Sequence, residues 1–404
     1  MRNVAIATLR LLSGVVAVPI LALLRMLRPW LRVRLLVVAS HRFGHLALEP
    51  EMELLRQKLM PRQRRPVVVD LWSFGSARIQ SNAYLVKLWA ERIHHPPSWV
   101  TGALVRGGEL FKFLALERPS LSIHGPKNGL DRGQRQCPTP TEFSAEEIRS
   151  LASVGFDPRK PYVALVVRDA DHYLLRGEQE DESSTLLNAD LSSFVAASAY
   201  LVENDLQVIR LGGPSRQSLP AIDGCVDYAN SAIRTAELDV KLATFCKFAV
   251  STQTGPDAVV LLARQPVLYV DVLRCSQFFF GTQLATWCPM RIKDPSDQRF
   301  WSLKRLCASN LLMAKNTDEF NRSGLQFIRS DSTQIREYVA DFLSELHHSA
   351  DEETLRSRMQ VNNTLQLAMG ERGQQKFGNI VAPISRIWLE KHGSWWMDAS
   401  APTK

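Results

Sequence analysis

Short apolar runs alternate with segments of helical spacing along most of this chain, and that alternation constrains its fold more than any other feature. Each run has the continuous hydrophobic character of a strand buried on both faces of a parallel sheet. The runs that we predict as strands lie at 34–40, 67–72, 162–169, 206–213, 248–251 and 266–272. Strands separated by helices form parallel sheets with helices on both faces. We therefore predict an α/β protein with two Rossmann-like lobes facing each other across a cleft.

The same alternation predicts the domain organisation. A chain of 404 residues is long enough for two ordinary domains with additional segments. The two blocks of strands and helices join near residue 140, where the sequence is rich in Pro and Thr. The predicted parts are a hydrophobic and basic helix at 1–32, a first Rossmann-like lobe at 33–140, a second at 141–349, and a helical and then polar tail at 350–404.

The N-terminus combines an apolar run with positive charge. Residues 1–65 contain 12 Lys and Arg against 3 Asp and Glu, whereas the rest of the chain contains 37 and 38. Residues 4–24 are apolar apart from Arg10, and arginines follow directly from Arg25. This pattern is typical of an anionic membrane surface rather than of nucleic acid as a partner. We predict an interfacial or spanning helix at the cytoplasmic face of the inner membrane. The alternatives are an amphipathic helix packed on the body and a cleaved signal peptide.

Several common catalytic and cofactor motifs are absent. The glycine pair that ends the strand at 206–213 belongs to neither a GxGxxG nor a GKS motif, and no GxSxG or HExxH occurs. The six cysteines contain no CxxC pair. These absences argue against a dehydrogenase, a P-loop kinase, a serine hydrolase, a zinc protease and a disulfide scaffold. Gly212 still lets a ligand approach the backbone closely, or it simply forms a tight turn.

Polar residues follow the first predicted strand. Arg42, Gly44 and His45 would lie at its carboxyl end, where α/β sheets bind their ligands. An imidazole can act as a general base on a hydroxyl group near neutral pH. Glu49, four residues further on, could orient it if the next helix begins early. The alternative is a histidine that only hydrogen-bonds to backbone at a helix start.

The strand at 162–169 delivers Arg168 and Asp169 to its carboxyl end. Arg168 would face a phosphate or carboxylate, while Asp169 holds the guanidinium by a charge-assisted hydrogen bond. Asp169 and Asp171 also spell DxD, a pattern of oxygen ligands for Mg²⁺ or Mn²⁺ in some sugar-nucleotide enzymes. Because the neighbouring arginine would compete with the ion, we predict no metal here.

The strand at 248–251 is followed by Thr252, Thr254 and Gly255, and Pro256 opens the next helix. The start of a helix offers unpaired N–H groups and the positive end of the helix dipole to an anion. A nucleotide diphosphate would fit there. The alternative is a hydroxyl cap without a ligand.

Blocks along the body together resemble a family of bacterial glycosyltransferases associated with surface-polysaccharide genes. The blocks are 42–51 (RFGHLALEPE), 143–148 (FSAEEI), 166–174 (VVRDADHYL), 188–190 (NAD), 208–213 (VIRLGG), 226–231 (VDYANS), 238–255 (LDVKLATFCKFAVSTQTG) and 335–343 (IREYVADFL). Their order and spacing are more specific than any one block. The family is of the two-lobed GT-B type, so the resemblance implies an acceptor-side first lobe and a nucleotide-sugar-side second lobe.

The resemblance also implies roles for matching residues. The predicted catalytic residues are His45, Arg168 and Asp169. The predicted substrate-binding residues are Arg42, Gly44, Tyr173, Asn188, Asp190, Arg210, Gly212, Asp227, Tyr228, Thr252, Thr254 and Gly255. The sequence departs from the family where Leu187 replaces an arginine and where Val250 and Ser251 precede Thr252. These departures leave open a different donor or weakened catalysis.

We therefore predict a metal-independent glycosyltransferase without a cofactor. It would move a sugar from a nucleotide-diphosphate donor to a lipid-linked or surface-polysaccharide acceptor, and it would bind no nucleic acid. Two alternatives remain on the same fold. One is a nucleotide-sugar epimerase or hydrolase, and the other is a non-catalytic nucleotide-sugar-binding scaffold.

Overall fold

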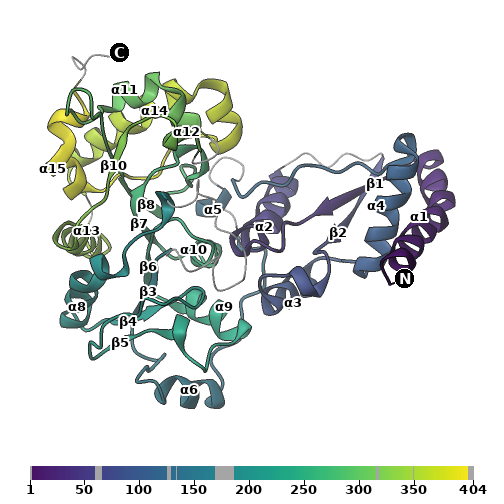
Figure 1. Cartoon of the computed structure of the whole chain (residues 1–404), viewed down its shortest axis with the longest axis horizontal. Coiled ribbons are helices and arrows are strands. Elements are labelled where there is room, and N and C mark those ends of the chain that lie inside the picture. Colours follow the sequence, from purple (N-terminus) through teal and green to yellow (C-terminus); the bar gives the residue numbers. More distant parts are fainter. Residues whose placement is uncertain are drawn as a thin grey trace. The chain divides into compact units, whose positions relative to one another are not determined.

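The chain forms two compact units (Figure 1). The computed structural model describes residues 2–59, 66–124, 129–132, 134–168, 186–314, 318–348 and 350–398. The first unit consists of Met1–Ile123 and Gln136–Pro138, and the second of His124–Arg135 and Thr139–Lys404. Both units contain parallel strands, and a helix begins the chain. The predicted α/β class and the predicted N-terminal helix are thus confirmed.

The first unit is built on two parallel strands. β1 (Leu31–Val37) and β2 (Val67–Ser73) pair along their whole length. α2 (Phe43–Leu59) lies between them in the sequence, in the order of a β-α-β unit. The other helical elements of this unit are α1 (Arg2–Met26), η1 (Ala77–Ile79), α3 (Ala83–Arg92), α4 (Ser98–Leu110) and η2 (Lys112–Leu114).

The sequence does not predict α4, because its three glycines lower its intrinsic helix propensity. In the structure one of them, Gly107, allows α4 to pack closely on α1. A Cβ atom at Gly107 would lie 2.9 Å from the carbonyl oxygen of Gly14. The side chains that form the small core at this contact are Ala17, Leu21, Leu104 and Leu114. Tertiary packing therefore stabilises a helix that propensity does not favour. Among the described helices, α1 included, none has the length and hydrophobicity needed to cross a bilayer.

The second unit contains a six-stranded parallel sheet in the order β5-β4-β3-β6-β7-β8. Its strands are β3 (Tyr162–Val166), β4 (Gln207–Arg210), β5 (Cys225–Val226), β6 (Phe248–Ser251), β7 (Val267–Val272) and β8 (Ala285–Pro289). All residues of β3 are buried, as expected for a continuous apolar strand inside a parallel sheet. β3 pairs with β4 on one side and with β6 on the other. The sequence does not predict β8.

Helices lie on both sides of this sheet and beyond it (Figure 1). α6 (Ala145–Ala152) begins with a capping box, in which the Ser144 hydroxyl accepts from the Glu147 amide and the Glu147 carboxylate accepts from the Ser144 amide. The remaining elements are α5 (Gly129–Arg132), η4 (Leu191–Phe194), α8 (Val195–Glu203), η5 (Tyr228–Asn230), α9 (Ala236–Phe245), α10 (Asp257–Leu262), η6 (Cys275–Gln277), β9 (Arg291–Lys293), α11 (Leu303–Ala308), η7 (Asn310–Met313), α12 (Asp318–Asn321), β10 (Gln326–Ile328), α13 (Ser332–Glu345), α14 (Glu352–Phe377) and α15 (Arg386–Trp396).

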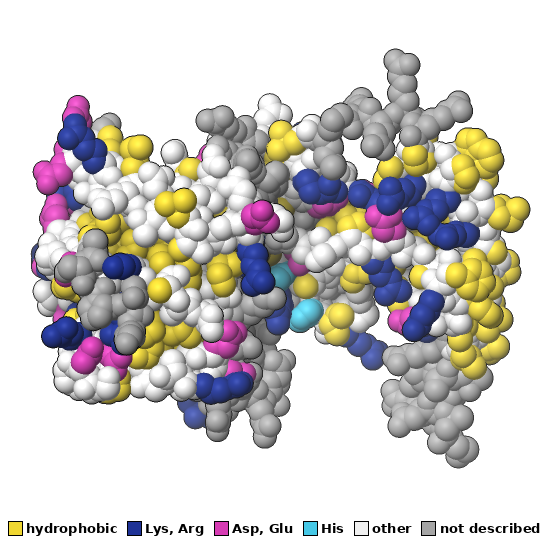
Figure 2. Space-filling model, turned by 90° about the horizontal axis from the view of Figure 1, so that it is seen from above, with side chains coloured by type: hydrophobic (Ala, Val, Ile, Leu, Met, Phe, Trp, Pro, Cys, Tyr) yellow, Lys and Arg dark blue, Asp and Glu magenta, His cyan; other side chains and the backbone are white. Residues whose placement is uncertain are grey.

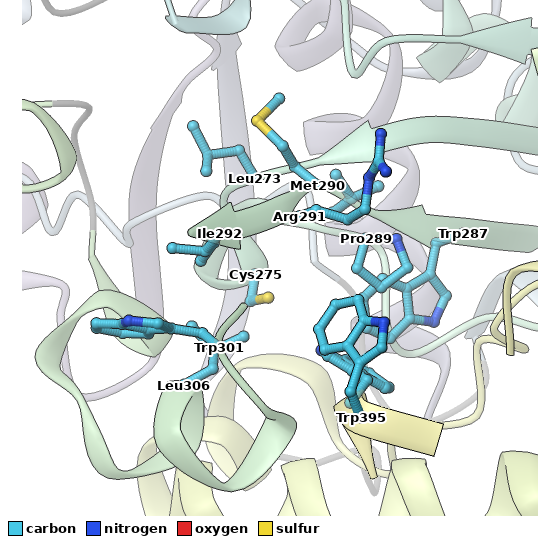
Figure 3. Close-up of a pocket in the computed structure, with 12 residues that line it drawn as sticks. Leu273, Cys275, Trp287, Pro289, Met290, Arg291, Ile292, Trp301, Leu306 and Trp395 are labelled. Atoms are coloured by element: carbon cyan, nitrogen blue, oxygen red, sulfur yellow. The ribbon is translucent and has the colours of Figure 1, made fainter. Parts of the chain in front are cut away.

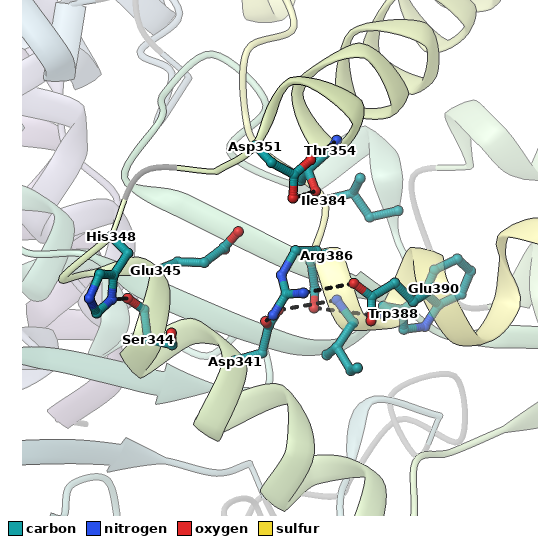
Figure 4. A network of polar contacts seen from close by, with 12 residues as sticks. Asp341, Ser344, Glu345, His348, Asp351, Thr354, Ile384, Arg386, Trp388 and Glu390 are labelled. Carbon is teal, nitrogen blue, oxygen red and sulfur yellow. Dashed lines mark hydrogen bonds and ion pairs between the residues drawn. The ribbon is translucent and has the colours of Figure 1, made fainter.

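Ion pairs join the three C-terminal helices. Figure 4 shows Arg386 at the start of α15 between Asp341 of α13 and Glu390. Arg358 of α14 lies 2.8 Å from the carboxylate of Glu345 in α13, and its Nε donates to the carbonyl oxygen of Ile384. Buried ion pairs with additional hydrogen bonds hold neighbouring elements in one arrangement, because a lone buried charge is costly.

We expect Arg358→Ala to lower the free energy of unfolding by about 3 kcal/mol, because the change leaves Glu345 largely buried without its charged partner. Arg356→Ala on the same helix is the matched control. Its pair with Glu352 is exposed, so the loss should be below about 0.5 kcal/mol. Urea unfolding followed by circular dichroism measures both values, and equal losses would contradict the prediction.

Candidate functional site

The strand order of the second unit creates a point where the chain reverses direction across the sheet. From β3 the chain builds β4 and β5 on one side, and it then returns to place β6, β7 and β8 on the other. In open parallel sheets, ligands bind outside the carboxyl ends of the two strands at such a switch point. Here those strands are β3 and β6, whose last paired residues are Val166 and Ser251.

The residues that follow these two strands are Arg168 and Thr252, and they contact each other. The Arg168 amide donates to Thr252 Oγ1 at 2.9 Å, and the Thr252 amide donates to the Val166 carbonyl oxygen at 3.2 Å. The Arg168 carbonyl oxygen accepts from the Ala189 amide at 2.8 Å. The backbone of Arg168 is therefore held on two sides at the switch point, while its side chain is half-buried.

The loop after β6 differs from the anion site that the sequence predicts. The buried Asp257 carboxylate accepts from the Thr254 amide at 2.9 Å and from the Ser251 hydroxyl at 2.6 Å. Because an acidic side chain already binds the Thr254 amide, that amide cannot also serve a phosphate in this arrangement. Burial raises the pKa of the Asp257 carboxyl to about 7. The prediction for Thr254 therefore needs correction, whereas Gly255 lies in the loop between these partners.

The sequence contains a signal for this contact. Thr254 and Asp257 have the Thr-x-x-Asp spacing of a capping box in front of an apolar run. In a capping box the acidic side chain reaches back to the backbone N–H three residues earlier, as Asp257 does here. Gln253, directly before Thr254, has a φ of 57°, a left-handed conformation that is uncommon outside glycine.

Arg210, one of the predicted substrate-binding residues, has partners within the protein. Its side chain at the end of β4 is almost fully buried, and Nη1 lies 3.1 Å from Asp227 Oδ1 and donates to the Gln217 carbonyl oxygen. Asp227 also accepts from the Leu219 amide at 3.1 Å. The pair therefore fastens the loop after β4. Gly212 in that loop has a φ of 139°, which favours glycine.

Three other predicted residues have partners inside the unit. Tyr228 is buried, accepts from the Thr235 amide through its hydroxyl, and has a pKa that burial raises. Asp190 accepts from the Ser192 amide and hydroxyl at the start of η4, and these hydrogen bonds hold its pKa below the usual range. Asn188 is half-buried beside this turn. Asp169 and Tyr173 lie outside the described residues, and so does Asp171.

In the first unit the predicted histidine and glutamate meet. His45 Nδ1 lies 2.7 Å from Glu49 Oε1, and Glu49 Oε2 accepts from the Ala39 amide at 2.8 Å. α2 begins at Phe43, early enough to place this pair on one helical face. An ionised carboxylate only accepts hydrogen bonds, so the proton of neutral His45 lies on Nδ1 and Nε2 keeps its lone pair. Arg42 is exposed just before this helix, and Gly44 lies in its first turn.

A small cavity lies elsewhere in the second unit (Figure 3). Its lining includes Trp287, Trp301, Trp395 and Cys275. It encloses about 20 Å³, which is roughly the room that one water molecule needs. A nucleotide does not fit there, so the switch point remains the candidate site.

Comparisons with known proteins give similarities in structure alone. No family model matches the sequence, and no curated protein is significantly similar to it. The iron-containing dodecameric glycosyltransferase TibC of enterotoxigenic E. coli is 13% identical, with a TM-score of 0.33. That match covers 64% of this chain and 62% of TibC, which is less than two thirds of its length.

Two further solved structures resemble the chain to a similar degree. A family 9 glycosyl transferase from Veillonella parvula is 12% identical, with a TM-score of 0.35 over 63% of this chain and 85% of that one. The ADP-heptose LPS heptosyltransferase II of E. coli is 13% identical, with a TM-score of 0.34 over 64% and 90%. At these identities the similarity concerns backbone arrangement and transfers no site residue.

Asp257→Asn tests the acidic cap of the loop after β6. The native state keeps the carboxyl proton up to about pH 7, whereas the unfolded chain loses it near the usual pKa of aspartate. Native protein therefore binds more protons in this range, and its stability falls as the pH rises. Asparagine keeps the accepting oxygen and does not titrate. The free energy of unfolding of the Asp257→Asn protein, relative to that of wild type, should rise by about 2 kcal/mol between pH 5 and pH 8. Urea unfolding at each pH measures this difference. A difference that does not change with pH would contradict this.

Proposed function

We propose that this protein is a glycosyltransferase that takes a sugar from a nucleotide-diphosphate donor. The observation that carries the proposal is the position of Arg168 and Thr252, which contact each other at the switch point of the second sheet. A guanidinium group at the carboxyl ends of parallel strands suits a diphosphate, because it offers paired N–H donors and a fixed charge.

In the proposed mechanism, Arg168 stabilises the negative charge that develops on the leaving diphosphate. A cation already held in place needs little reorganisation during the reaction, and such electrostatic stabilisation is usually a large part of catalysis. The backbone bonds of Arg168 to Thr252 and Ala189 hold its position. Gly255 would then contribute to donor binding by its backbone, Thr252 by the hydrogen of its hydroxyl group, and Asn188 by its side chain. Thr254 and Arg210 are not part of this proposal, because Asp257 and Asp227 already bind them.

For the acceptor, we propose that His45 Nε2 takes the proton of the attacking hydroxyl group. Glu49 acts as a positioning residue, because it holds Nδ1 and is itself held by the Ala39 amide. The acceptor would be a lipid-linked or surface-polysaccharide sugar at the cytoplasmic face of the inner membrane. The basic N-terminal segment supports that location, since it would keep the protein near anionic lipid.

A non-catalytic nucleotide-sugar-binding scaffold is the second candidate. It is favoured by the two predicted phosphate-binding groups that have partners inside the protein, the Arg210 guanidinium and the Thr254 amide. Such a scaffold would bind donor without converting it. Turnover of any nucleotide sugar would rule it out.

Arg168→Ala should weaken binding of a nucleoside diphosphate by about tenfold or more, because a hydrogen bond to a charged group contributes about 1.5–3 kcal/mol. Isothermal titration with ADP, UDP and GDP measures the dissociation constant. Arg159→Ala is the matched control, since Arg159 is an exposed arginine of the same unit that pairs with Asp157. If Arg168→Ala binds as tightly as this control, the proposed donor site is wrong.

A double-mutant cycle tests the acceptor side. His45→Asn should lower kcat by about 10²–10⁴, as expected for loss of a general base. Glu49→Gln should lower kcat in the parent protein and cause no further loss in the His45→Asn protein, because it acts through His45. Additive losses of kcat would show that Glu49 acts independently of His45 and would contradict its role as a positioning residue.

A further inference from the structure

We propose that the membrane-binding surface of this protein is not α1 alone but a joint face of α1 and the corner after α4, which inserts into the interface of an anionic bilayer. We call it the α1–η2 face. It consists of Val16, Leu23 and Met26 from α1 with Leu110, Phe111 and Phe113 from the corner, all of them exposed. This inference deepens the proposed membrane location and does not require the proposed donor site.

The two sides of α1 differ in what they contact. Gly14, Ala17 and Leu21 lie three to four residues apart and face α4, where they are buried. On the other side, Val16 is 71% exposed and Met26 is 74% exposed. A helix that is apolar on both sides requires an apolar environment on its second side as well.

The corner after α4 lies beside α1 and carries exposed apolar side chains of its own. A Cβ atom at Gly14 would lie 3.3 Å from Leu110 Cδ1, so the end of α4 touches α1 directly. Leu114 packs into the core that α1 shares with α4. The rings of Phe111 and Phe113 lie 6.1 Å apart, and Phe113 is 68% exposed. Figure 2 shows hydrophobic side chains gathered over α1 and α4, at the right of the view. Exposed contiguous apolar patches of this kind mark interaction surfaces.

Charge favours an anionic bilayer over an apolar protein as the partner. The chain contains no Asp or Glu before Glu49 but six arginines up to residue 34. Arg25 and Arg28 are exposed where α1 ends, beside the exposed ring of Trp30. Arginines next to an apolar helix face bind anionic headgroups, and tryptophan favours the same interfacial depth.

Flotation of the full-length protein with phosphatidylcholine vesicles, with and without phosphatidylglycerol, tests the proposal. We expect binding to the anionic vesicles. Combined Phe111→Ser and Phe113→Ser should lower the partition coefficient about tenfold or more, because two apolar side chains no longer enter the lipid. Leu367→Ser is the matched control, since Leu367 is an exposed apolar residue of the second unit, and it should bind as the parent does. Arg25→Gln with Arg28→Gln should lower binding roughly fivefold per arginine, and only to vesicles with phosphatidylglycerol.

Three outcomes would overturn the inference. If the parent protein does not bind anionic vesicles, both the membrane location and the joint face are wrong. If the phenylalanine variant binds as the parent does, α1 acts alone. If sedimentation without lipid shows a dimer that the phenylalanine variant abolishes, a second copy of the chain covers the face. Nucleotide titration of the same variants is unaffected by any of these results, so it separates this inference from the donor site.

Discussion

The parallel pairing of β3 with β6 is the interaction on which the proposed donor site depends. These strands lie more than 80 residues apart in the sequence, yet Val166 pairs with Ser251 at their carboxyl ends. That register places the Arg168 amide within hydrogen-bond distance of Thr252 Oγ1. A shift of one residue would move every side chain of the strand to the opposite face of the sheet. The register of the sheet thus brings Arg168 and Thr252 together, and the proposed donor site depends on that contact.

In the second unit, some polar side chains have structural roles, and one arginine is proposed to bind a ligand. Arg210 pairs with Asp227 and the Asp257 side chain binds the Thr254 amide, so these contacts stabilise the loops after β4 and β6. Burying such groups without partners would be costly. Arg168 is half-buried and follows β3 at the switch point, where its amide contacts Thr252. This position in the sheet is the reason that Arg168 is proposed for the diphosphate.

In the first unit, the His45–Glu49 pair and the α1–η2 face have different physical origins. The His45–Glu49 pair relies on helical spacing, since residues four apart share one face and a helix that begins at Phe43 brings the two side chains together. The α1–η2 face relies on close packing at Gly14 and Gly107, which lets two apolar helices contact each other and leaves further apolar side chains exposed. One feature serves proton transfer in our proposal, and the other serves attachment to lipid.

Local patterns were enough to predict the α/β class, most strands and the meeting of His45 with Glu49, because these depend on residues that are near in sequence. The helix α4, the strand β8 and the burial of Trp388 in the tail were not predictable in this way. The partners of the Arg210 guanidinium and the Thr254 amide were also not predictable, since a sequence shows which polar groups are present but not which other groups they bind. These features depend on long-range packing. Buried polar groups are almost always hydrogen-bonded, and only the tertiary structure decides which groups bind each other.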